Sequence, residues 1–266
     1  MKHKKLLTVF ISVVFVLIVG FAAFTLFTVK NVGVSFSIYG VSSYRSESVT
    51  QKLKTLKGKN IVAVSEKKTR DMLKDDTYFE LVSFKKKFPD KIEITLKERR
   101  AGYYVVYGEN YYIISQEGFV LEKTDVLPDK ELVKISVTDK DKNGYVFGEP
   151  VVGGYFCSSD NSGKDISAKI TAELLTLCGQ VDILGCIKEV GIFSTSSVTE
   201  ICFYTKTSVV LDLFDVYNDG KNKLTALTEA YNQSDDFAKA EYTITLGEKD
   251  ENGKYTVIWS PTGSEA

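Results

Sequence analysis

Hydrophobic positions are unevenly spread along this chain of 266 residues, and the longest apolar run lies near the N-terminus. From Leu6 to Phe27 there are 22 consecutive residues without a charge. At about 1.5 Å per residue, a helix over this run is about 33 Å long, enough to cross a hydrocarbon core of about 30 Å. The pattern therefore predicts one transmembrane helix over residues 6–27, preceded by a short tail over residues 1–5.

The charges around this run predict its orientation. Lys2, Lys4 and Lys5 precede it, and only Lys30 lies close after it. The positive-inside rule then keeps the tail in the cytoplasm and makes the rest extracytoplasmic, as in a single-pass type II membrane protein. A cleaved signal peptide is the alternative, but its apolar region usually runs for about 7 to 15 residues. The segment 21–24 is also a poor cleavage site.

The segment after the apolar run, residues 28–100, switches between strand and helix patterns. The predicted elements are a strand, two short helices and two further strands, at 36–40, 49–56, 65–73, 78–87 and 92–97. This order predicts a compact α+β module with a small core of its own.

Strand patterns dominate the chain from residue 101 onward. Apolar positions at helical spacing interrupt them twice, near 166–174 and 224–231. Two late alternating segments, 242–246 and 255–259, flank an Asn-Gly pair and predict a closing hairpin. The predicted parts are a β-rich domain with two helices over residues 101–260 and a flexible tail over residues 261–266. The fold class is therefore α+β.

Charge and histidine content narrow the possible chemistry. The chain holds 34 Lys+Arg and 35 Asp+Glu, a formal charge of −1, which argues against a nucleic-acid partner because such a partner needs a basic face. The only histidine, His3, precedes the apolar run. The exported part therefore cannot build a Ser-His-Asp or Cys-His nucleophile system, or a zinc site that uses imidazole. No catalytic residue, cofactor or metal ligand is predicted.

All four cysteines lie in the second half of the exported part, at Cys157, Cys178, Cys186 and Cys202. Four cysteines can pair in three ways, and an oxidising exterior permits pairing. A chain of this size does not need disulfides for stability, which favours buried thiols that behave as small apolar residues. Both interpretations stay open at this point.

Basic residues gather on two neighbouring predicted strands, at Lys85, Lys86, Lys87, Lys97, Arg99 and Arg100. Solvated strand faces explain such a pattern, since lysine protects strand edges against aggregation. Contact with an anionic lipid or wall polymer is the alternative.

Three short motifs raise an enzymatic alternative. Ser65-Glu66-Lys67-Lys68, Ser159-Asp160-Asn161 and Lys206-Thr207-Ser208 resemble, in order, motifs of penicillin-binding proteins and β-lactamases. In those enzymes the first serine is the nucleophile and the nearby lysine helps to move its proton. The context favours coincidence, because the predicted helix after Ser65 is short and charged, strands fill the interval, and the third motif lacks its glycine. The alternative is a membrane-anchored serine acyltransferase or hydrolase that uses Ser65 and Lys68.

The layout of a basic tail, an apolar helix, a small α+β module and a β-rich domain resembles the FtsQ/DivIB family of cell-division proteins, whose first module is a POTRA domain. The matching segments are Phe36-x-Ile38-x-Gly40, Gly58-Lys59-Asn60, Phe88 to Arg99, Ile113 to Val120, and Val209 to Leu213 followed by Lys223-Leu224-x-x-Leu227. Two features depart from the family. Arg100-Ala101-Gly102 stands where a proline is usual, and Ser115 stands where an aspartate is common. Residues 139–185 match little of the family pattern.

The resemblance implies a non-enzymatic scaffold at the division septum of the cell membrane. Family members bind two small single-pass proteins, FtsL and DivIC (FtsB in other bacteria), and regulate septal peptidoglycan synthesis. An exposed edge strand that accepts a partner strand offers a physical route to such binding. The candidate strand is Tyr255 to Trp259, with Tyr255, Val257 and Trp259 on one face as the partner-binding residues. The alternative is that these three side chains simply close the core.

Overall fold

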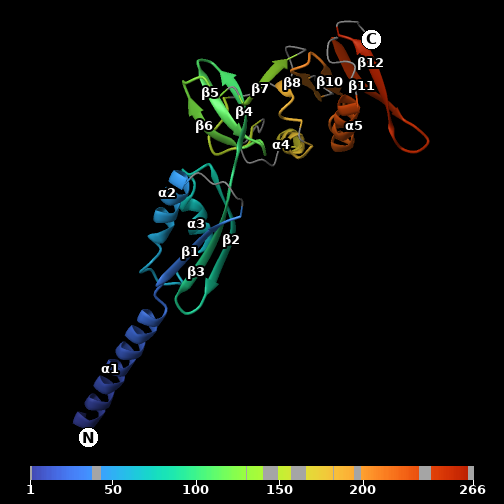
Figure 1. Cartoon of the computed structure of the whole chain (residues 1–266). Coiled ribbons are helices and arrows are strands. Elements are labelled where there is room, and N and C mark those ends of the chain that lie inside the picture. Colours follow the sequence, from blue (N-terminus) through green and yellow to red (C-terminus); the bar gives the residue numbers. More distant parts are fainter. Residues whose placement is uncertain are drawn as a thin grey trace. The chain divides into compact units, whose positions relative to one another are not determined.

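The computed structural model covers the whole chain and describes residues 2–37, 43–129, 131–139, 149–156, 166–181, 183–194, 199–233 and 241–262. The chain divides into two compact units, Met1–Arg99 (unit 1) and Arg100–Ala266 (unit 2). Figure 1 shows a long helix and a small sheet in unit 1, and a larger sheet with two helices in unit 2.

The elements alternate in a mixed α+β order. The helices are α1 (Lys2–Leu26), α2 (Ser43–Lys54), α3 (Glu66–Met72), α4 (Ile166–Gln180) and α5 (Gly220–Gln233). The strands of unit 1 are β1 (Asn31–Phe36), β2 (Phe79–Lys87) and β3 (Lys91–Glu98). Those of unit 2 are β4 (Ala101–Tyr107), β5 (Asn110–Ser115), β6 (Val120–Thr124), β7 (Val133–Asp139), β8 (Ile187–Ser194), β9 (Thr199–Thr205), β10 (Val210–Leu213), β11 (Tyr242–Lys249) and β12 (Tyr255–Pro261).

In unit 1 a three-stranded sheet of order β1-β3-β2 packs one face against α2 and α3. β1 pairs parallel to β3, and β2 pairs antiparallel to β3 through a tight hairpin. Along β3, Ile92, Ile94 and Leu96 are fully buried in the core, whereas the residues between them face the other side. This alternation is the one that predicted the strand, because successive side chains of a strand point to opposite faces.

The observed order β1-α2-α3-β2-β3 confirms the predicted strand, helix, helix, strand, strand. The first strand was predicted at 36–40; the structure has a strand over Asn31–Phe36, which shares Phe36 with that span, and residues 38–42 lie outside the described residues. Ser65 is the N-cap of α3, and its hydroxyl accepts a hydrogen bond from the Lys68 amide at 3.3 Å. Such a cap satisfies one of the free amides of the first helical turn.

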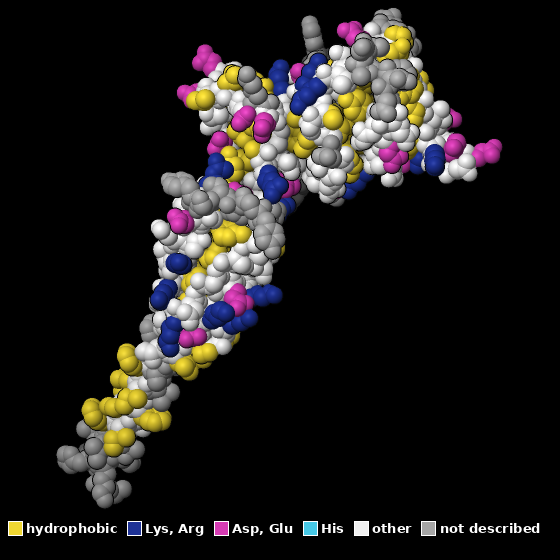
Figure 2. Space-filling model, in the orientation of Figure 1, with side chains coloured by type: hydrophobic (Ala, Val, Ile, Leu, Met, Phe, Trp, Pro, Cys, Tyr) yellow, Lys and Arg dark blue, Asp and Glu magenta, His cyan; other side chains and the backbone are white. Residues whose placement is uncertain are grey.

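Helix α1 carries the apolar run of the N-terminus. The side chains of Phe10, Phe15, Val16 and Phe21 are each exposed by more than half, and Figure 2 shows apolar side chains on the part of this helix that is not grey. Among the residues that the structure describes, no helix is sufficiently long and apolar to pass through a membrane. The transmembrane helix over residues 6–27 stays a prediction.

In unit 2, nine strands form one mixed sheet of order β12-β11-β10-β9-β8-β7-β4-β5-β6. Neighbours are antiparallel except at β11–β10, β8–β7 and β7–β4, which are parallel. Parallel neighbours need a crossover connection. The segments between β7 and β8 and between β10 and β11 contain α4 and α5 respectively, so the two helices predicted from apolar spacing are also what permits the parallel pairings.

The core of unit 2 lies between this sheet and the two helices. Leu174 and Leu175 of α4 and Leu224 and Leu227 of α5 are almost fully buried in it. Each such side chain contributes about 1.5–3 kcal/mol by leaving water. The Tyr103 hydroxyl of β4 donates to the Leu175 carbonyl at 2.8 Å, which ties the sheet to α4.

Candidate interaction site at the edge strand β12

β12 forms one end of the nine-stranded sheet. Among the described residues it pairs with β11 only, from Tyr242↔Pro261 to Lys249↔Tyr255. β6, at the opposite end, is partly covered, because the Val120 amide donates to Gly154 and the Gly153 amide donates to Val120. β12 therefore presents main-chain groups of the kind that accept a further strand.

Tyr255, Val257 and Trp259 lie on one face of β12, as the alternation predicts, and all three are half-buried. Val257 and Trp259 pack against the core of unit 2. Trp259 pairs in register with Ile244 of β11, which is fully buried. Partial burial gives these side chains support from the core and leaves part of each available to a partner, so that core packing and partner binding are compatible.

A groove of about 570 Å³ runs between this face of the β11–β12 hairpin and α5. Its α5 side is lined by Asn222, Thr225, Ala226, Glu229, Ala230 and Gln233, and its hairpin side by Lys249, Gly253, Lys254, Tyr255, Val257 and Trp259. Small and polar side chains on the helix face apolar and aromatic ones on the strand. Grooves of this size hold ligand side chains or short peptide segments.

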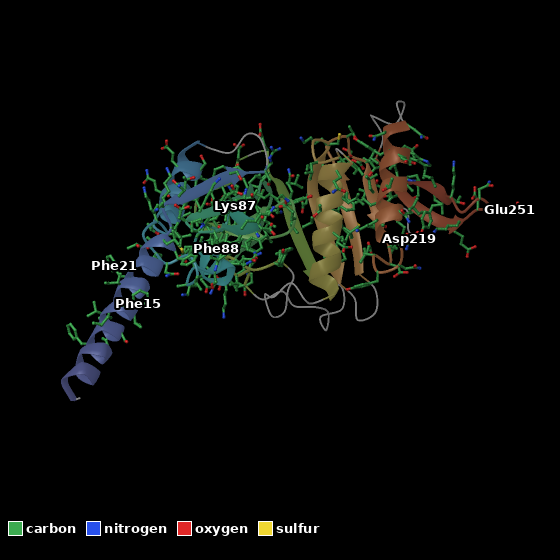
Figure 3. The ribbon with its side chains drawn as sticks, turned by 90° about the horizontal axis from the view of Figure 1, so that it is seen from below. Phe15, Phe21, Lys87, Phe88, Asp219 and Glu251 are labelled. Carbon is green, nitrogen blue, oxygen red and sulfur yellow. The ribbon has the colours of Figure 1, made fainter. Side chains whose placement is uncertain are left out.

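Asp219, the residue before α5, binds two residues of the hairpin that line this groove, Lys249 and Tyr255. Its Oδ2 accepts hydrogen bonds from Lys249 Nζ at 2.8 Å and from the Tyr255 hydroxyl at 2.7 Å. Asn222 donates to the other oxygen of the same carboxylate. Figure 3 shows Asp219 beside α5 and Glu251 at the far tip of the hairpin. We call Asp219, Lys249 and Tyr255 the hairpin clamp.

The clamp shifts the pKa values of its members. Hydrogen bonds, first from Lys249 and then from Tyr255, lower the pKa of the Asp219 carboxyl to about 2. The bond to Asp219 raises the pKa of Lys249, and desolvation followed by the hydrogen bond to Asp219 raises the pKa of Tyr255. All three shifts favour the state that keeps the clamp closed, with Asp219 ionised and Lys249 and Tyr255 protonated.

The sequence patterns did not reveal the clamp or the α5 side of the groove. Lys249 and Tyr255 lie 30 and 36 residues from Asp219, and no local spacing links such positions. A local signal was present at Asp219 itself. Its carbonyl accepts from the Lys223 amide at 3.0 Å, and an aspartate just before an amphipathic stripe is a common start of a helix.

The structure does not support the enzymatic alternative. Ser65 acts as a helix cap, and Lys68 Nζ donates to the Ala63 carbonyl at 3.0 Å. Helix α3 has only seven residues. In unit 2, Lys206 Nζ donates to the Gly185 carbonyl at 2.7 Å, and Ser159-Asp160-Asn161 lie outside the described residues.

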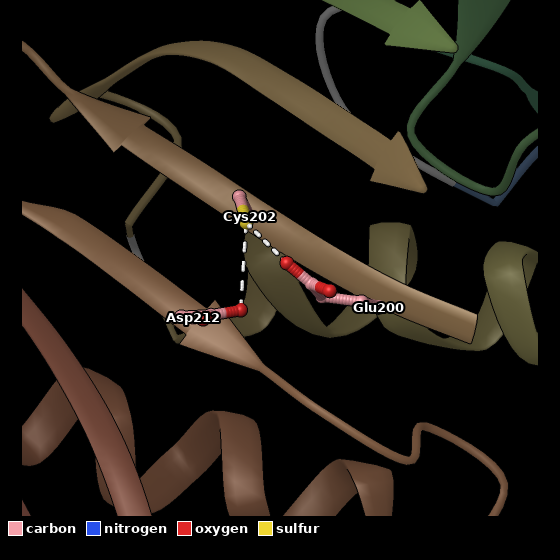
Figure 4. Close-up of side chains that lie close together, drawn as sticks. All are labelled: Glu200, Cys202 and Asp212. Atoms are coloured by element: carbon pink, nitrogen blue, oxygen red, sulfur yellow. Dashed lines mark hydrogen bonds between the residues drawn. The ribbon is translucent and has the colours of Figure 1, made fainter. Parts of the chain in front are cut away.

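A second cluster of reactive side chains lies on the sheet face away from the helices. Cys202 Sγ lies 3.5 Å from Glu200 Oε1 and 3.4 Å from Asp212 Oδ1 (Figure 4). Burial, and then the charges of Asp212 and Glu200, raise the pKa of the Cys202 thiol far above its ordinary value. The thiol is therefore protonated beside these two carboxylates and serves as a hydrogen-bond donor.

Three of the four cysteines fall within the described residues. Cys178, Cys186 and Cys202 are free, and Cys178 and Cys202 are buried. Burial raises the pKa of Cys178 to about 12. These features agree with the preference for buried thiols; Cys157 lies outside the described residues.

Comparison with known proteins defines the class of unit 1. Residues 34–99 match the family described as POTRA domain, FtsQ-type, which confirms the POTRA module that the family resemblance implied. Proteins named cell division protein DivIB are similar to a longer stretch. The Clostridium acetobutylicum protein is 33% identical over 109 residues, 41% of this chain and 42% of the relative.

Two further relatives carry the same name. The Clostridium botulinum protein is 26% identical over 163 residues, 61% of this chain and 59% of the relative. The Clostridium tetani protein is 31% identical over 109 residues, 41% of this chain and 40% of the relative. The matches thus span between two fifths and three fifths of the relatives' own lengths. Together with the FtsQ-type POTRA domain, they confirm the resemblance of this chain to the FtsQ/DivIB family.

Proposed function

We propose that this protein is a non-enzymatic scaffold of the bacterial division septum. It binds small single-pass division proteins of the FtsL and DivIC (FtsB) type and through them regulates septal peptidoglycan synthesis. The proposal is supported by the FtsQ-type POTRA domain, by relatives named cell division protein DivIB, and by the open edge of β12. The main observation behind the proposed mechanism of partner binding is that β12 lies at an open edge of its sheet.

The same proposal places the chain in the cell membrane through α1. The 22 uncharged residues from Leu6 to Phe27 and the exposed apolar side chains of this helix support a membrane anchor. The lysines before Leu6 support a cytoplasmic N-terminus and extracytoplasmic units 1 and 2. The domains proposed are a tail over 1–5, a transmembrane helix over 6–27, the POTRA domain over 28–100, the β-rich domain over 101–260 and a tail over 261–266.

Binding proceeds by strand addition at β12. A partner segment in extended conformation pairs with the free edge through main-chain hydrogen bonds, which supply affinity for any extended sequence. Alternate side chains of that segment then meet Tyr255, Val257 and Trp259 on the groove side, and this contact supplies specificity. Aromatic anchors at the centre of an interface commonly dominate its binding energy.

Two measurements test this function together. A fluorescent fusion of the full chain should concentrate at the division septum, and detergent-solubilised full chain should co-purify with small coiled-coil membrane proteins. Trp259→Ala should reduce the co-purified amount while circular dichroism of the chain stays unchanged. Uniform distribution around dividing cells without such partners contradicts the scaffold. Unfolding of unit 2 by Trp259→Ala would make this residue a core residue rather than a binding residue.

A further inference from the structure

The hairpin between β2 and β3 in the POTRA unit has an unusual tip. Phe88 stands there with 59% of its surface exposed. Its ring meets that of Phe27, the residue after α1, edge to face at a centroid distance of 6.1 Å. The tip therefore continues the exposed apolar surface of α1, as the positions of Phe21 and Phe88 in Figure 3 indicate. A continuous exposed apolar surface commonly marks a site of interaction.

Main-chain hydrogen bonds fix this tip to the segment that leaves α1. The Lys30 and Asn31 amides both donate to the Asp90 carbonyl, at 2.8 and 3.2 Å. On the other side of that segment, the Val29 amide donates to the Lys59 carbonyl at 2.9 Å. The hairpin tip and the Lys59 loop thus flank the point where the chain leaves the proposed membrane anchor.

Lysines surround the exposed ring. Lys30, Lys87 and Lys91 lie at the tip and retain 62%, 58% and 45% of their side-chain exposure. Two acidic residues lie among these lysines. Asp90 forms an ion pair with Lys30 at 3.6 Å. Glu93 forms ion pairs with Lys87 at 2.9 Å and with Lys91 at 2.6 Å. The nearby loop adds exposed Lys57 and Lys59, so basic groups outnumber acidic ones at this end of unit 1 (Figure 2).

The other basic residues of these strands have different roles. Arg99 donates from its guanidinium to the Thr77 and Phe79 carbonyls at 3.1 Å, and only 12% of its side chain is exposed. Lys97 pairs in register with Glu80, six residues along β3 from Lys91. The exposed positive charge next to α1 is therefore concentrated at the hairpin tip and the Lys59 loop.

We propose that the β2–β3 hairpin tip, with Phe88 at its apex and Lys30, Lys87 and Lys91 around it, docks on the anionic lipid surface from which α1 emerges. This inference rests on the proposed membrane anchoring of α1. An exposed Phe ring inserts at the boundary between headgroups and acyl chains, and neighbouring lysines are attracted by anionic headgroups. Docking would hold the POTRA domain against the membrane instead of leaving it free to pivot on the chain after α1.

The test uses the full chain in vesicles of equal parts phosphatidylglycerol and phosphatidylcholine. Trp259 is the only tryptophan, so a Trp259→Phe background allows a single fluorescent reporter to be placed at the tip by Phe88→Trp, the tip reporter. The matched control is Val82→Trp, the strand reporter, which replaces an apolar residue of β2 with 54% exposure. If the Trp259→Phe background does not fold, the same reporters are read as differences from the chain that retains Trp259.

Lipids brominated near the headgroup should quench the tip reporter at least about twice as strongly as the strand reporter, and only the tip reporter should shift its emission to the blue. Replacing phosphatidylglycerol with phosphatidylcholine, or adding the double variant Lys87→Gln with Lys91→Gln, should lower the quenching of the tip reporter. The control double variant, Lys74→Gln with Lys97→Gln, should leave that quenching unchanged.

Three results would overturn the inference, and they differ in what they leave standing. Co-flotation with vesicles without preferential quenching of the tip reporter rejects docking and retains the anchor. Failure of the chain to co-float rejects the anchor, and docking with it. A shift of the tip reporter's emission produced by soluble poly(glycerol phosphate) but not by the bilayer replaces lipid with wall polymer as the ligand.

Discussion

Two strands at sheet edges, β2 in unit 1 and β12 in unit 2, differ in the charge of their side chains. The exposed positions of β2 include Lys85 and Lys87, whereas β12 reads Tyr-Thr-Val-Ile-Trp-Ser-Pro and has no charged residue. An edge with lysines resists pairing with another chain, and an uncharged, aromatic edge does not. Of these two edges, β2 is thus protected and β12 is open, which is the difference that the proposed capture of a single partner strand requires.

The supports behind the two edges also differ. β2 pairs with the central strand β3 over most of its length, but the hairpin of β12 joins the rest of its sheet through only two residue pairs, Val210↔Thr243 and Leu211↔Ile244. Core packing against α5 and the hairpin clamp provide further attachment of the β11–β12 hairpin to the rest of unit 2. The open edge therefore depends on side chains of α5 more than the protected edge depends on any helix.

The largest expected effect comes from removing that support. Leu227 of α5 is fully buried, and Leu227→Ala should lower the free energy of unfolding of unit 2 by about 2–5 kcal/mol, through lost burial and the cavity left behind. This change in the free energy of unfolding is measured from the fluorescence of Trp259 during denaturant unfolding. Glu229→Ala, an exposed change on the same helix, should stay within about 0.5 kcal/mol. An unchanged midpoint for Leu227→Ala would show that β12 does not depend on α5.

The next effect tests the edges directly. Ile258 of β12 and Val82 of β2 are exposed to similar extents, 47% and 54%. Ile258→Lys places on β12 the kind of charge that protects β2. The variant should bind a DivIC-type partner about tenfold more weakly, the equivalent of about 1.4 kcal/mol. Val82→Lys should leave the affinity unchanged, as measured by calorimetric titration with the partner's extracytoplasmic segment. Equal losses in both variants would remove the distinction between the edges.

The hairpins at these two edges show which structural features the sequence patterns predict. The alternation of Ile92, Ile94 and Leu96 predicted β3 and its hairpin with β2, because antiparallel pairs joined by a tight turn are local. The closing hairpin was likewise predicted, with Tyr255, Val257 and Trp259 on one face of its second strand. The clamp at Asp219 was not, since contacts across 30 and 36 residues leave no periodic signal.

The position of β1 shows a different failure. Val32, Val34 and Phe36 alternate with Asn31, Gly33 and Ser35, so a strand signal was present, but it follows the apolar run directly and the predicted strand began only at Phe36. The strand order of unit 2 was not predicted, because its parallel pairs join strands that other elements separate along the chain: α4 lies between β7 and β8, α5 between β10 and β11, and β5 and β6 between β4 and β7. The groove depends on that order and was therefore not predictable.

Acid should loosen the open edge by a smaller amount. The pKa of Asp219 is depressed from 3.8 to about 2, so the clamp contributes its full stabilisation above the ordinary pKa and loses it as the pH falls through that interval. The signal is a change in Trp259 fluorescence between those pH values before global unfolding. Asp219→Asn should abolish this step, and Asp215→Asn, which changes a neighbouring exposed acid, should retain it. A step that persists in Asp219→Asn would belong to another carboxylate.

The smallest effect concerns the protected edge. Lys85→Thr together with Lys87→Thr removes exposed charge from β2 without touching the core, so the free energy of unfolding should change by less than about 0.5 kcal/mol. The edge should then pair with other copies, because nothing repels a second strand. Sedimentation velocity in mild detergent at rising concentration should show oligomers absent from a Lys67→Thr, Lys74→Thr control. If both double variants stay monomeric, lysines are not what keeps β2 unpaired.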